Sequence, residues 1–321
     1  MSKHAYIAPK RLSENIISSQ IINMAETKQG DVYQYKKEGK YTYTGYINLF
    51  LKIKSYENIY IRDAIDFFFI RILTFFIGKS KLTYDFRAVV SEELIYKNRG
   101  YFKVRIFRFL EAFCYYTADE LRTVSKNQKY YLKEYYKKNR EVKVVPCGIS
   151  DVIQRENYFI NEKDTIKICY VGGLSSWQKF DEVCALFCKL IGNNKNIHLE
   201  VVTKEKSQAE VILRKYKLSN YVKVVSLQQG EVSNYISKFD YGVIFRDDSI
   251  INKVSCPIKV VEYMSRGICP IFKGSIGDFS DDPEFNQISL SYDEVDKLGY
   301  CLKGLHIQRE RISQYAKKYI W

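Results

Sequence analysis

The sequence contains only three histidines, and its eight cysteines form no C-x-x-C pair and no cluster with histidine. Metal sites built from Cys and His need such closely spaced ligands, so none is predicted. Several of the cysteines lie inside apolar runs, where a free thiol packs as a small hydrophobe. The chain also begins without a secretory signal. We therefore expect a reducing, cytoplasmic compartment.

Long hydrophobic runs are also absent. The longest, "FFFIRILTFFIG" (67–78), is interrupted by Arg71 and is well below the roughly 18 residues that a spanning helix needs. There is no short-period repeat, no low-complexity tract and no nucleic-acid recognition motif. Hydrophobic residues nevertheless make up 46% of the 321 residues, which is enough to build the cores of two domains.

Acidic residues are scarce in the first half. Residues 1–150 hold 27 Lys and Arg against 15 Asp and Glu, a net charge of +12, which leaves +2 for the remainder. A basic half predicts an anionic partner: nucleic acid, a membrane surface or a phosphorylated substrate. A solvated lysine-rich surface explains the charge equally well. Within this half, "YFKVRIFRFLEAFCYY" (101–116) places three cations among aromatics, a composition that suits an anionic membrane surface.

Strands and helices alternate along the whole chain. Apolar β-branched runs at 4–8, 31–35, 58–62 and 81–86 are separated by segments with helical spacing, among them 13–27 and 63–77. After a polar interval at 155–165 the alternation begins again at 166–171. The pattern predicts an α/β fold of two Rossmann-like doubly wound domains facing across a cleft, residues 1–152 and residues 153–321.

A first loop in the second half has features of a phosphate site. The strand 166–171 leads directly into Gly172 and Gly173, whose missing side chains would let backbone amides approach a ligand. Lys179 stands at the start of the next helix, where free N–H groups and the helix dipole favour an anion. Taken alone this signal is weak, because many α/β domains use glycines in this turn.

A second loop follows the strand 241–245 and leads into "VSCPIKVVEYMSRGICPIF" (254–272). Here Ser255 is the predicted N-cap, and Gly267 ends the helix. Parallel strands open on the same edge, so Lys179, Arg246 and Glu262 are predicted to meet there. Two cations would suit phosphates, and a carboxylate would suit sugar hydroxyls. The alternative is that Glu262 pairs with a neighbouring Lys or Arg.

These two segments resemble the donor half of retaining group 1 (family 4) glycosyltransferases, which have the GT-B fold. The likeness extends over most of residues 81–321, including 118–150 and 311–321. Residues 1–80 match only loosely. The residues that carry the likeness are Gly172, Gly173, Lys179, Arg246, Pro257, Lys259, Glu262, Tyr263, Met264 and Gly267.

The resemblance implies a role for each part of the site. Lys179 and Arg246 would stabilise the nucleotide diphosphate leaving group without a metal or other cofactor, and Glu262 would bind the ribose hydroxyls. The remaining donor contacts would come from Gly172, Gly173, Ser226, Leu227, Ser255, Cys256, Pro257, Ile258 and Lys259.

The sequence departs from the family pattern in three places. The family often has a second carboxylate eight residues before Glu262, where this chain has Val254. Gln178 replaces the basic residue that often precedes the phosphate-binding lysine, and Arg246 would supply the missing cation. The sequence ends at Trp321, so we expect the helix that crosses back to the first domain to be short or lacking.

In the first half, "YDFRAVVSEE" (84–93) follows a predicted strand, and Asp85 and Arg87 are candidates for contact with an acceptor. A surface ion pair without a role explains them equally well. The expected function is transfer of a sugar from a UDP- or GDP-linked donor to a glycan or polyprenyl-diphosphate-linked acceptor. We expect this to serve bacterial surface polysaccharide synthesis in the cytoplasm, with peripheral attachment to the inner face of the cell membrane and no nucleic-acid partner.

Three other functions stay open. A non-catalytic GT-B relative would bind a glycan or a partner transferase, a reading that Val254 favours. A nucleic-acid binder would show steep salt dependence. An epimerase of similar build would act on the nucleotide-sugar without any acceptor.

Overall fold

The computed structural model describes residues 3–8, 21, 24–26, 29–34, 43–77, 79–153, 158–159, 165–193, 196–297 and 306–320. The chain forms two compact units, Met1–Pro146 and Cys147–Ile320. The predicted boundary lies a few residues later because the segment after Pro146 already bonds to the second unit. In it, the N–H of Ile149 donates to the Tyr319 carbonyl over 2.9 Å, and that of Ile153 to the Ser265 carbonyl over 2.9 Å.

The first unit contains, in the described part of the chain, a parallel six-stranded sheet of order β2-β1-β3-β4-β5-β6. Its strands are β1 (His4–Ala8), β2 (Asp31–Gln34), β3 (Asn58–Ile61), β4 (Lys81–Phe86), β5 (Glu120–Thr123) and β6 (Val142–Val144). Its helices include α2 (Tyr43–Ile53), α3 (Ala64–Ile77), α4 (Val90–Tyr96), α5 (Tyr101–Thr117) and α6 (Lys126–Tyr136).

Along β1, alternate side chains point to opposite faces of the sheet and pack in two different hydrophobic clusters. Ala5 and Ile7 of β1 pack in a cluster with residues of α2, α3, α5 and α6. Tyr6 and Ala8 point to the other face, where they pack with Ile21 and Ala25. A sheet that is buried on both faces explains why its strands are nearly continuous apolar runs. The predicted helix over 13–27 lies for the most part outside the described residues.

The second unit contains, where its residues are described, a parallel sheet of order β10-β9-β8-β11-β12-β13. Its strands are β8 (Ile166–Val171), β9 (Ile197–Val202), β10 (Val222–Val225), β11 (Tyr241–Phe245), β12 (Cys269–Lys273) and β13 (Leu290–Ser291), and β7 (Tyr158–Phe159) pairs separately with β14 (His306–Ile307). Its helical segments are η1 (Ser176–Gln178), α7 (Phe180–Asn193), α8 (Lys206–Lys215), α9 (Gln229–Ile236), α10 (Ile250–Lys253), α11 (Ile258–Ser265), η2 (Gly277–Asp281), α12 (Pro283–Ile288), α13 (Tyr292–Lys297), α14 (Arg309–Ala316) and η3 (Lys317–Tyr319).

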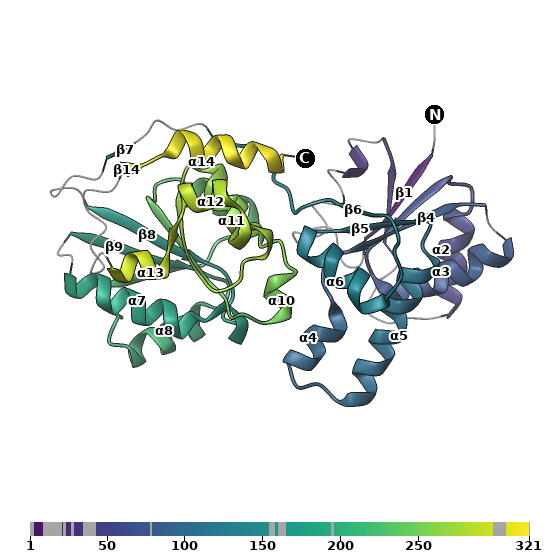
Figure 1. Ribbon diagram of the computed structural model, residues 1–321, viewed down its shortest axis with the longest axis horizontal. Helices are drawn as coiled ribbons and strands as arrows, with labels where there is room; N and C mark the ends of the chain where they lie inside the picture. The colour runs from purple at the N-terminus through teal and green to yellow at the C-terminus, as the bar shows by residue number, and fades with distance from the viewer. Residues whose placement is uncertain are drawn as a thin grey trace. The chain divides into compact units, whose positions relative to one another are not determined.

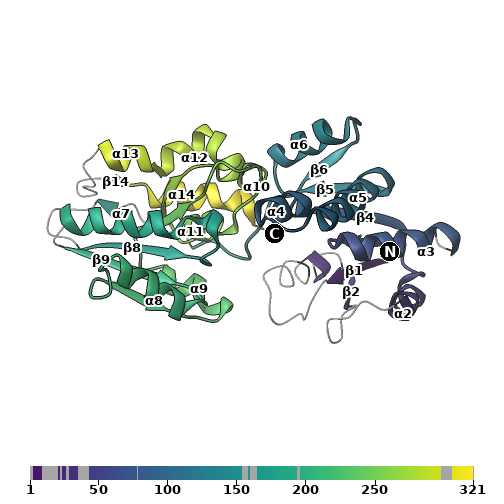
Figure 2. The same ribbon diagram turned by 90° about the horizontal axis from the view of Figure 1, so that it is seen from below.

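This strand order is that of the doubly wound dinucleotide-binding fold. The chain moves outward from β8 to β10, returns to β11 beside β8, and then moves the other way. Right-handed crossovers therefore place the helices of the first half, which connect β8 to β10, on one face of the sheet, and helices that follow β11 on the other. Figures 1 and 2 show the result: α7 and α8 cover one face of the sheet, whereas α11, α12 and α14 cover the other. Both units thus have the predicted Rossmann-like α/β architecture.

Most predicted elements are present, with shifts of a few residues at their ends. Helix α6 stops at Tyr136 because Lys137 adopts a left-handed conformation, with φ of 52°. The predicted cap of α11 is wrong. This helix begins at Ile258 with Pro257 at the N-cap, and the Ser255 hydroxyl instead donates to the Asn252 carbonyl over 2.9 Å. Gly267 follows the helix with φ of 65°, as predicted.

Candidate functional site

The strand order of the second sheet reverses between β8 and β11. Loops that leave two such strands turn to opposite faces, which opens a crevice beyond their carboxyl ends. Gly172 and Gly173 follow β8, and Arg246 follows β11. The topology therefore brings both predicted loops to the place where ligands of this fold class bind.

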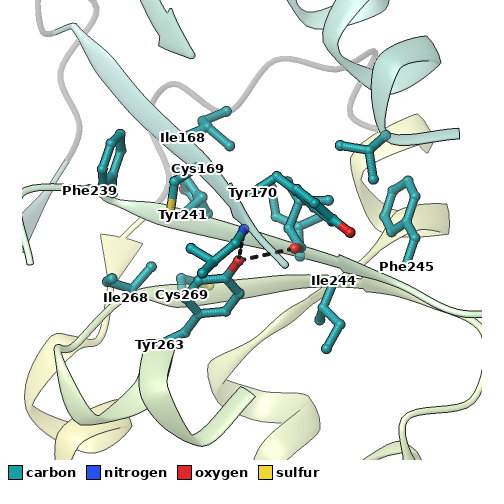
Figure 3. Close-up of a cluster of buried hydrophobic side chains, with 14 of the residues drawn as sticks. Ile168, Cys169, Tyr170, Phe239, Tyr241, Ile244, Phe245, Tyr263, Ile268 and Cys269 are labelled. Carbon is teal, nitrogen blue, oxygen red and sulfur yellow. Dashed lines mark hydrogen bonds between the residues drawn. The ribbon is translucent and has the colours of Figure 1, made fainter. Parts of the chain in front are cut away.

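Tyr263 fixes α11 at this reversal. The ladder between β8 and β11 extends only to the pair Tyr170 and Val243. Beyond it, the N–H of Val171 donates to the Tyr263 hydroxyl over 2.9 Å, and the hydroxyl donates to the Val243 carbonyl over 3.2 Å. Figure 3 shows the ring beneath the two strands with both hydrogen bonds. Because the side chain is fully buried, the pKa of Tyr263 is raised. The hydroxyl thus holds the strands apart and anchors α11.

The same tyrosine explains a glycine within the sheet. A Cβ atom at Gly242 would lie 2.6 Å from the Tyr263 ring, so only glycine fits at this point of β11. The sequence motif that contains Tyr263 is therefore partly a packing motif. Its role in the fold does not require a ligand.

The room at Gly172 and Gly173 is filled by the chain itself. A Cβ at Gly172 would lie 2.7 Å from Gln178 Oε1 and 3.1 Å from the Tyr170 hydroxyl. The Tyr170 hydroxyl donates to the Gly173 carbonyl over 2.6 Å and lies 2.9 Å from Gln178 Oε1. Glu205 closes the turn by accepting the N–H of Leu174 over 2.6 Å. At both glycines a Cβ would meet the ends of side chains such as Gln178, which can shift, so packing alone does not require glycine here and contact with a donor stays a prediction.

Lys179 lies at the junction of η1 and α7. It has a left-handed backbone, with φ of 52°, that ends η1 and lets α7 start in a new direction. Its Nζ is 3.8 Å from Glu182 Oε1, and the other oxygen of Glu182 is 2.7 Å from Lys273 Nζ. These side chains are between 35% and 41% exposed, so two cations and one acid lie within reach of solvent. The group carries a net positive charge at the sheet edge.

Sequence reasoning missed Lys273. It is the last residue of β12 and pairs with Phe245, the last residue of β11. Its Nζ also lies 4.5 Å from the centre of the Tyr292 ring. A lysine that closes a buried strand is a detectable signal, because the carboxyl end of a parallel strand reaches the ligand-binding edge.

Arg246 is held by its backbone. Its N–H donates to the Lys273 carbonyl over 2.9 Å, and its guanidinium donates to the Phe245 carbonyl over 3.2 Å. Burial lowers the pKa of Arg246, and Tyr170 is close enough to oppose this shift. A guanidinium stays charged even so. Arg246 therefore places a second fixed cation beside the loop that carries Lys179.

Two glycines after β12 set the position of both flanking loops, and sequence reasoning missed them. Gly274 has φ of 73°, and a Cβ there would lie 2.1 Å from the Arg246 carbonyl oxygen. Gly277 has φ of 67°, and a Cβ there would lie 1.9 Å from the carbonyl oxygen of Ser255. Left-handed backbone and close approach both exclude other residues. This loop therefore fixes Arg246 and the segment that leads into α11.

The segment that leads into α11, together with the first residue of the helix, carries four of the predicted donor contacts. Ser255, Cys256, Pro257 and Ile258 are all partly buried. The sulfur of Cys256 accepts the N–H of Cys147 over 3.3 Å. Within the described residues, the N–H groups of Ile258 and Lys259 donate to no carbonyl, as is usual at a helix start. These two groups are the available backbone donors here.

Glu262 pairs with Lys259. The distance from Lys259 Nζ to Glu262 Oε2 is 2.8 Å, and about a fifth of each side chain is exposed. The alternative reading of Glu262 as an ion-pair partner therefore holds in this structure. Its other oxygen, Oε1, accepts no hydrogen bond from any described residue, so it keeps the capacity to bind a hydroxyl. Val254, where the family often has an acid, is buried.

The predicted residues do not all form one cluster. Lys179 joins Lys273 through Glu182, and Lys259 joins Glu262. No contact among the described residues links Lys179 to Glu262, because α7 and α11 cover opposite faces of the sheet (Figure 1). The pair Ser226 and Leu227 follows β10 at the same edge, with Ser226 exposed and Leu227 half-buried.

In the first unit, Asp85 and Arg87 form a buried pair instead of the surface pair considered above. Asp85 is fully buried, 2.5 Å from Arg87 Nε and 3.3 Å from Arg62 Nε. It also accepts the Tyr60 hydroxyl. Burial opposes ionisation, yet the guanidinium groups of Arg87 and Arg62 hold the pKa of Asp85 below its usual value. An enclosed carboxylate of this kind orients its arginines.

Sequence reasoning missed the rest of this cluster. The guanidinium groups of Arg62 and Arg122 lie 5.5 and 5.6 Å from the centre of the Tyr60 ring, within cation–π range. Burial is the main cause that raises the pKa of Tyr60 to about 12, and Asp85 adds to it. Three arginines thus converge at the carboxyl ends of β3, β4 and β5. Arginines are too common on surfaces for spacing alone to have revealed this.

The described residues form neither a group of metal ligands nor a membrane-spanning helix. No group of three His, Cys, Asp or Glu side chains among the described residues is placed to hold a metal ion. Asp247 and Asp248, which follow Arg246, bond to Asn252 and Ser275 over 2.7 and 2.8 Å. In the described part of the chain, every helix is too short or too polar to cross a bilayer.

No family model and no curated protein matches the chain. Solved structures match over both units. The lipopolysaccharide outer core galactosyltransferase WaaB is 12% identical, with a TM-score of 0.68 over 99% of this chain and 95% of that chain. The sucrose-phosphate synthase from Thermosynechococcus elongatus is 12% identical, with a TM-score of 0.72 over 100% and 96%. HepE from Anabaena, in complex with UDP-glucose, is 12% identical, with a TM-score of 0.66 over 100% and 96%.

At this level of identity the likeness concerns the fold. It agrees with the fold class predicted from sequence and with the resemblance on which that prediction partly rested. The chain therefore has the two-unit Rossmann-like fold of the GT-B glycosyltransferases.

Proposed function

We propose that this protein is a retaining glycosyltransferase that uses a UDP- or GDP-linked sugar as donor. The acceptor is a glycan or a polyprenyl-diphosphate-linked glycan, and the product belongs to a bacterial surface polysaccharide. The reaction needs no metal. The enzyme works in the cytoplasm, attached peripherally to the inner face of the cell membrane.

One observation carries this proposal: three cations lie at the carboxyl edge of the second sheet, beside its strand reversal. Lys179, Arg246 and Lys273 follow or end the strands β8, β11 and β12. Cleavage of the anomeric bond leaves negative charge on the departing diphosphate, and fixed cations stabilise that charge in the transition state. The match to HepE, solved with UDP-glucose, supports a donor of this class.

The rest of the donor would bind around these cations. The N–H groups of Ile258 and Lys259 would donate to phosphate or sugar oxygens, and Glu262 Oε1 would accept the ribose hydroxyls. Ser226 and Leu227 would contact the base. In a front-face mechanism, the leaving phosphate oxygen would take the proton of the acceptor hydroxyl as the new glycosidic bond forms, which retains the anomeric configuration.

The acceptor would bind at the carboxyl edge of the first sheet. Arg87, whose side chain is 13% exposed, would contact a phosphate or hydroxyl there, and Asp85 holds its guanidinium group in place. Bidentate arginine suits phosphate particularly well. This assignment refines the prediction from sequence, because Asp85 itself is enclosed.

A non-catalytic relative is the second candidate. The Lys259–Glu262 pair and the buried Val254 favour it, since an acid that is already paired can be structural. Such a protein would bind a glycan or a partner transferase without turnover.

Thermal unfolding with UDP, GDP and their sugars tests the proposal. One nucleotide at about 100 times its Kd should stabilise the protein by about 2.7 kcal/mol, and Lys179→Ala should lose most of this shift. Lys167→Ala is the matched control, because Lys167 is exposed on the same strand, β8, at its opposite end. If no nucleotide shifts the transition, or if both variants respond alike, the donor site is wrong.

A further inference from the structure

Several large aromatic side chains of the first unit are exposed on two neighbouring helices. Phe75 and Phe76 at the end of α3 are 81% and 78% exposed, and Phe102 and Phe109 of α5 are 77% and 60% exposed. Single exposed apolar residues are ordinary on a protein surface. A contiguous group of aromatics is not, and it commonly marks a surface that binds a partner or a membrane.

These side chains form one continuous stripe. On α5, Phe102, Ile106, Phe109 and Phe113 recur at spacings that place them on one helix face. The ring of Phe68 on α3 lies 6.1 Å from that of Phe109 and 4.9 Å from that of Phe113. The two helices therefore present a single surface, the α3–α5 face.

The α3–α5 face also contains a groove. It has a volume of about 870 Å³ and is lined by Ile72, Phe75, Phe76, Phe113 and Tyr116, among others. Figure 1 shows α3 and α5 next to each other in the first unit, and Figure 2 shows the same from below. The groove lies where their C-terminal ends meet, so the apolar surface is hollowed at that end.

The exposed charges of α5 beside the stripe are all positive, and the acid that lines the groove, Asp119, is paired with Arg71 over 3.0 Å. Lys103 and Arg105 are exposed on α5, and neither forms an ion pair with any described residue. Arg105 donates instead to the Tyr101 hydroxyl over 3.1 Å. Arg108 is 3.7 Å from Glu92 on α4. The only acidic residue of α5, Glu111, is buried. The exposed part of α5 is therefore apolar and basic, without an exposed acid.

We propose that the α3–α5 face binds the surface of an anionic lipid bilayer. Aromatic side chains would enter the headgroup region, and the cations of α5 would contact lipid phosphates. A second copy of the chain suits this face less well, because Lys103, Arg105 and Arg108 would meet their own like charges. The inference specifies the membrane attachment proposed above, and it does not depend on the donor site.

Sedimentation with lipid vesicles tests the inference without any activity measurement. The wild-type protein should bind vesicles of phosphatidylcholine with phosphatidylglycerol, and binding should weaken in pure phosphatidylcholine and at high salt. The triple variant Phe75→Ser, Phe76→Ser, Phe102→Ser should bind at least about tenfold more weakly. The variant Val211→Ser, Tyr221→Ser is the matched control, because both residues are similarly exposed in the second unit. It should bind like the wild type.

A variant without two of the cations separates the electrostatic contribution to vesicle binding from the contribution of the aromatic side chains. Lys103→Gln with Arg105→Gln should reduce binding to the anionic vesicles by about fivefold for each cation removed, and leave binding to pure phosphatidylcholine unchanged. Circular dichroism of each variant shows whether the fold is intact. The proposal is overturned if the wild type does not bind anionic vesicles at low salt, or if the triple variant binds them as strongly as the wild type does. It is also overturned by a third result: light scattering shows that the wild type is a dimer and the triple variant a monomer, and neither protein binds lipid.

Discussion

Each unit places an acid between two cations at the carboxyl edge of its sheet. In the first unit Asp85 lies between Arg62 and Arg87, and its side chain is fully buried. In the second unit Glu182 lies between Lys179 and Lys273, and all three side chains remain more than a third exposed. The carboxyl edge of the sheet thus holds a closed charge cluster in one unit and an open one in the other.

This difference separates a cluster that stabilises the fold from one whose cations can bind a ligand. A buried acid is strongly coupled to its partners, since removal of one leaves uncompensated charge in a poorly solvated place. A half-exposed acid is coupled weakly, because water screens each pair. The lysines of the open cluster can therefore turn from Glu182 toward an incoming diphosphate at little cost, whereas the arginines of the closed cluster stay where Asp85 holds them.

The largest effect is expected for Asp85→Asn. It removes the charge that balances Arg62 and Arg87 while it keeps the size of the side chain. We expect the free energy of unfolding of the first unit to fall by about 3–5 kcal/mol, measured by denaturant unfolding. The matched variant Glu182→Gln should change stability by no more than about 1 kcal/mol. Equal losses in both variants would remove the distinction between a closed and an open cluster.

Donor turnover should depend on charged residues of the second unit. Lys179→Ala or Glu262→Ala should abolish most donor turnover while the fold stays intact. For Lys179→Ala, loss of one cation at the diphosphate corresponds to about 2–4 kcal/mol, or roughly 30- to 1000-fold in kcat. Sugar release from a UDP- or GDP-linked donor measures it, and Lys167→Ala again serves as control. Near-normal turnover in both site variants would refute the site.

Much of the fold could be predicted from sequence because the physical signal is local. Buried parallel strands such as β4, β8 and β11 are short apolar runs, and their predicted bounds agree with the structure. The left-handed Gly267 also follows from residue type. The cap of α11 could not be predicted, since Ser255 has the right residue type but the chain adds one more turn, α10, just before it.

The site was predicted less completely, because its geometry depends on contacts between distant segments. Lys179 and Arg246 could be placed at one edge from the strand order alone. The link from Lys179 through Glu182 to Lys273 needs α7 and β12 side by side, and Arg62 beside Asp85 needs β3 next to β4. Gly274 matters only because the Arg246 carbonyl lies against it. None of these contacts joins residues at a fixed, recognisable spacing in the sequence.

Two buried glutamates extend the comparison between the units to pH. Glu111 in the first unit is bonded mainly to Ser91, whose hydroxyl donates over 2.6 Å, and burial raises the pKa of Glu111 to about 7. Glu200 in the second unit is equally buried, yet hydrogen bonds from Tyr235, Lys238 and His198 hold its pKa below the usual value. One acid is therefore neutral and the other ionised when the protein is folded at pH 6.

The two acids should affect stability with opposite slopes. An acid with a raised pKa binds its proton more tightly in the folded chain, so its contribution is greatest near pH 4.5 and is lost as the pH rises to 7. Between pH 5 and pH 8 this amounts to about 2–3 kcal/mol, which Glu111→Gln should remove from the denaturant stability curve. Glu200 contributes above its usual pKa of 4.5 and loses that contribution only as the pH falls below it, so Glu200→Gln should destabilise about equally at pH 5 and pH 8 and progressively less below pH 4.5. If Glu111→Gln leaves the slope between pH 5 and pH 8 unchanged, Glu111 is ionised in the folded chain and the contrast between the two buried acids is lost.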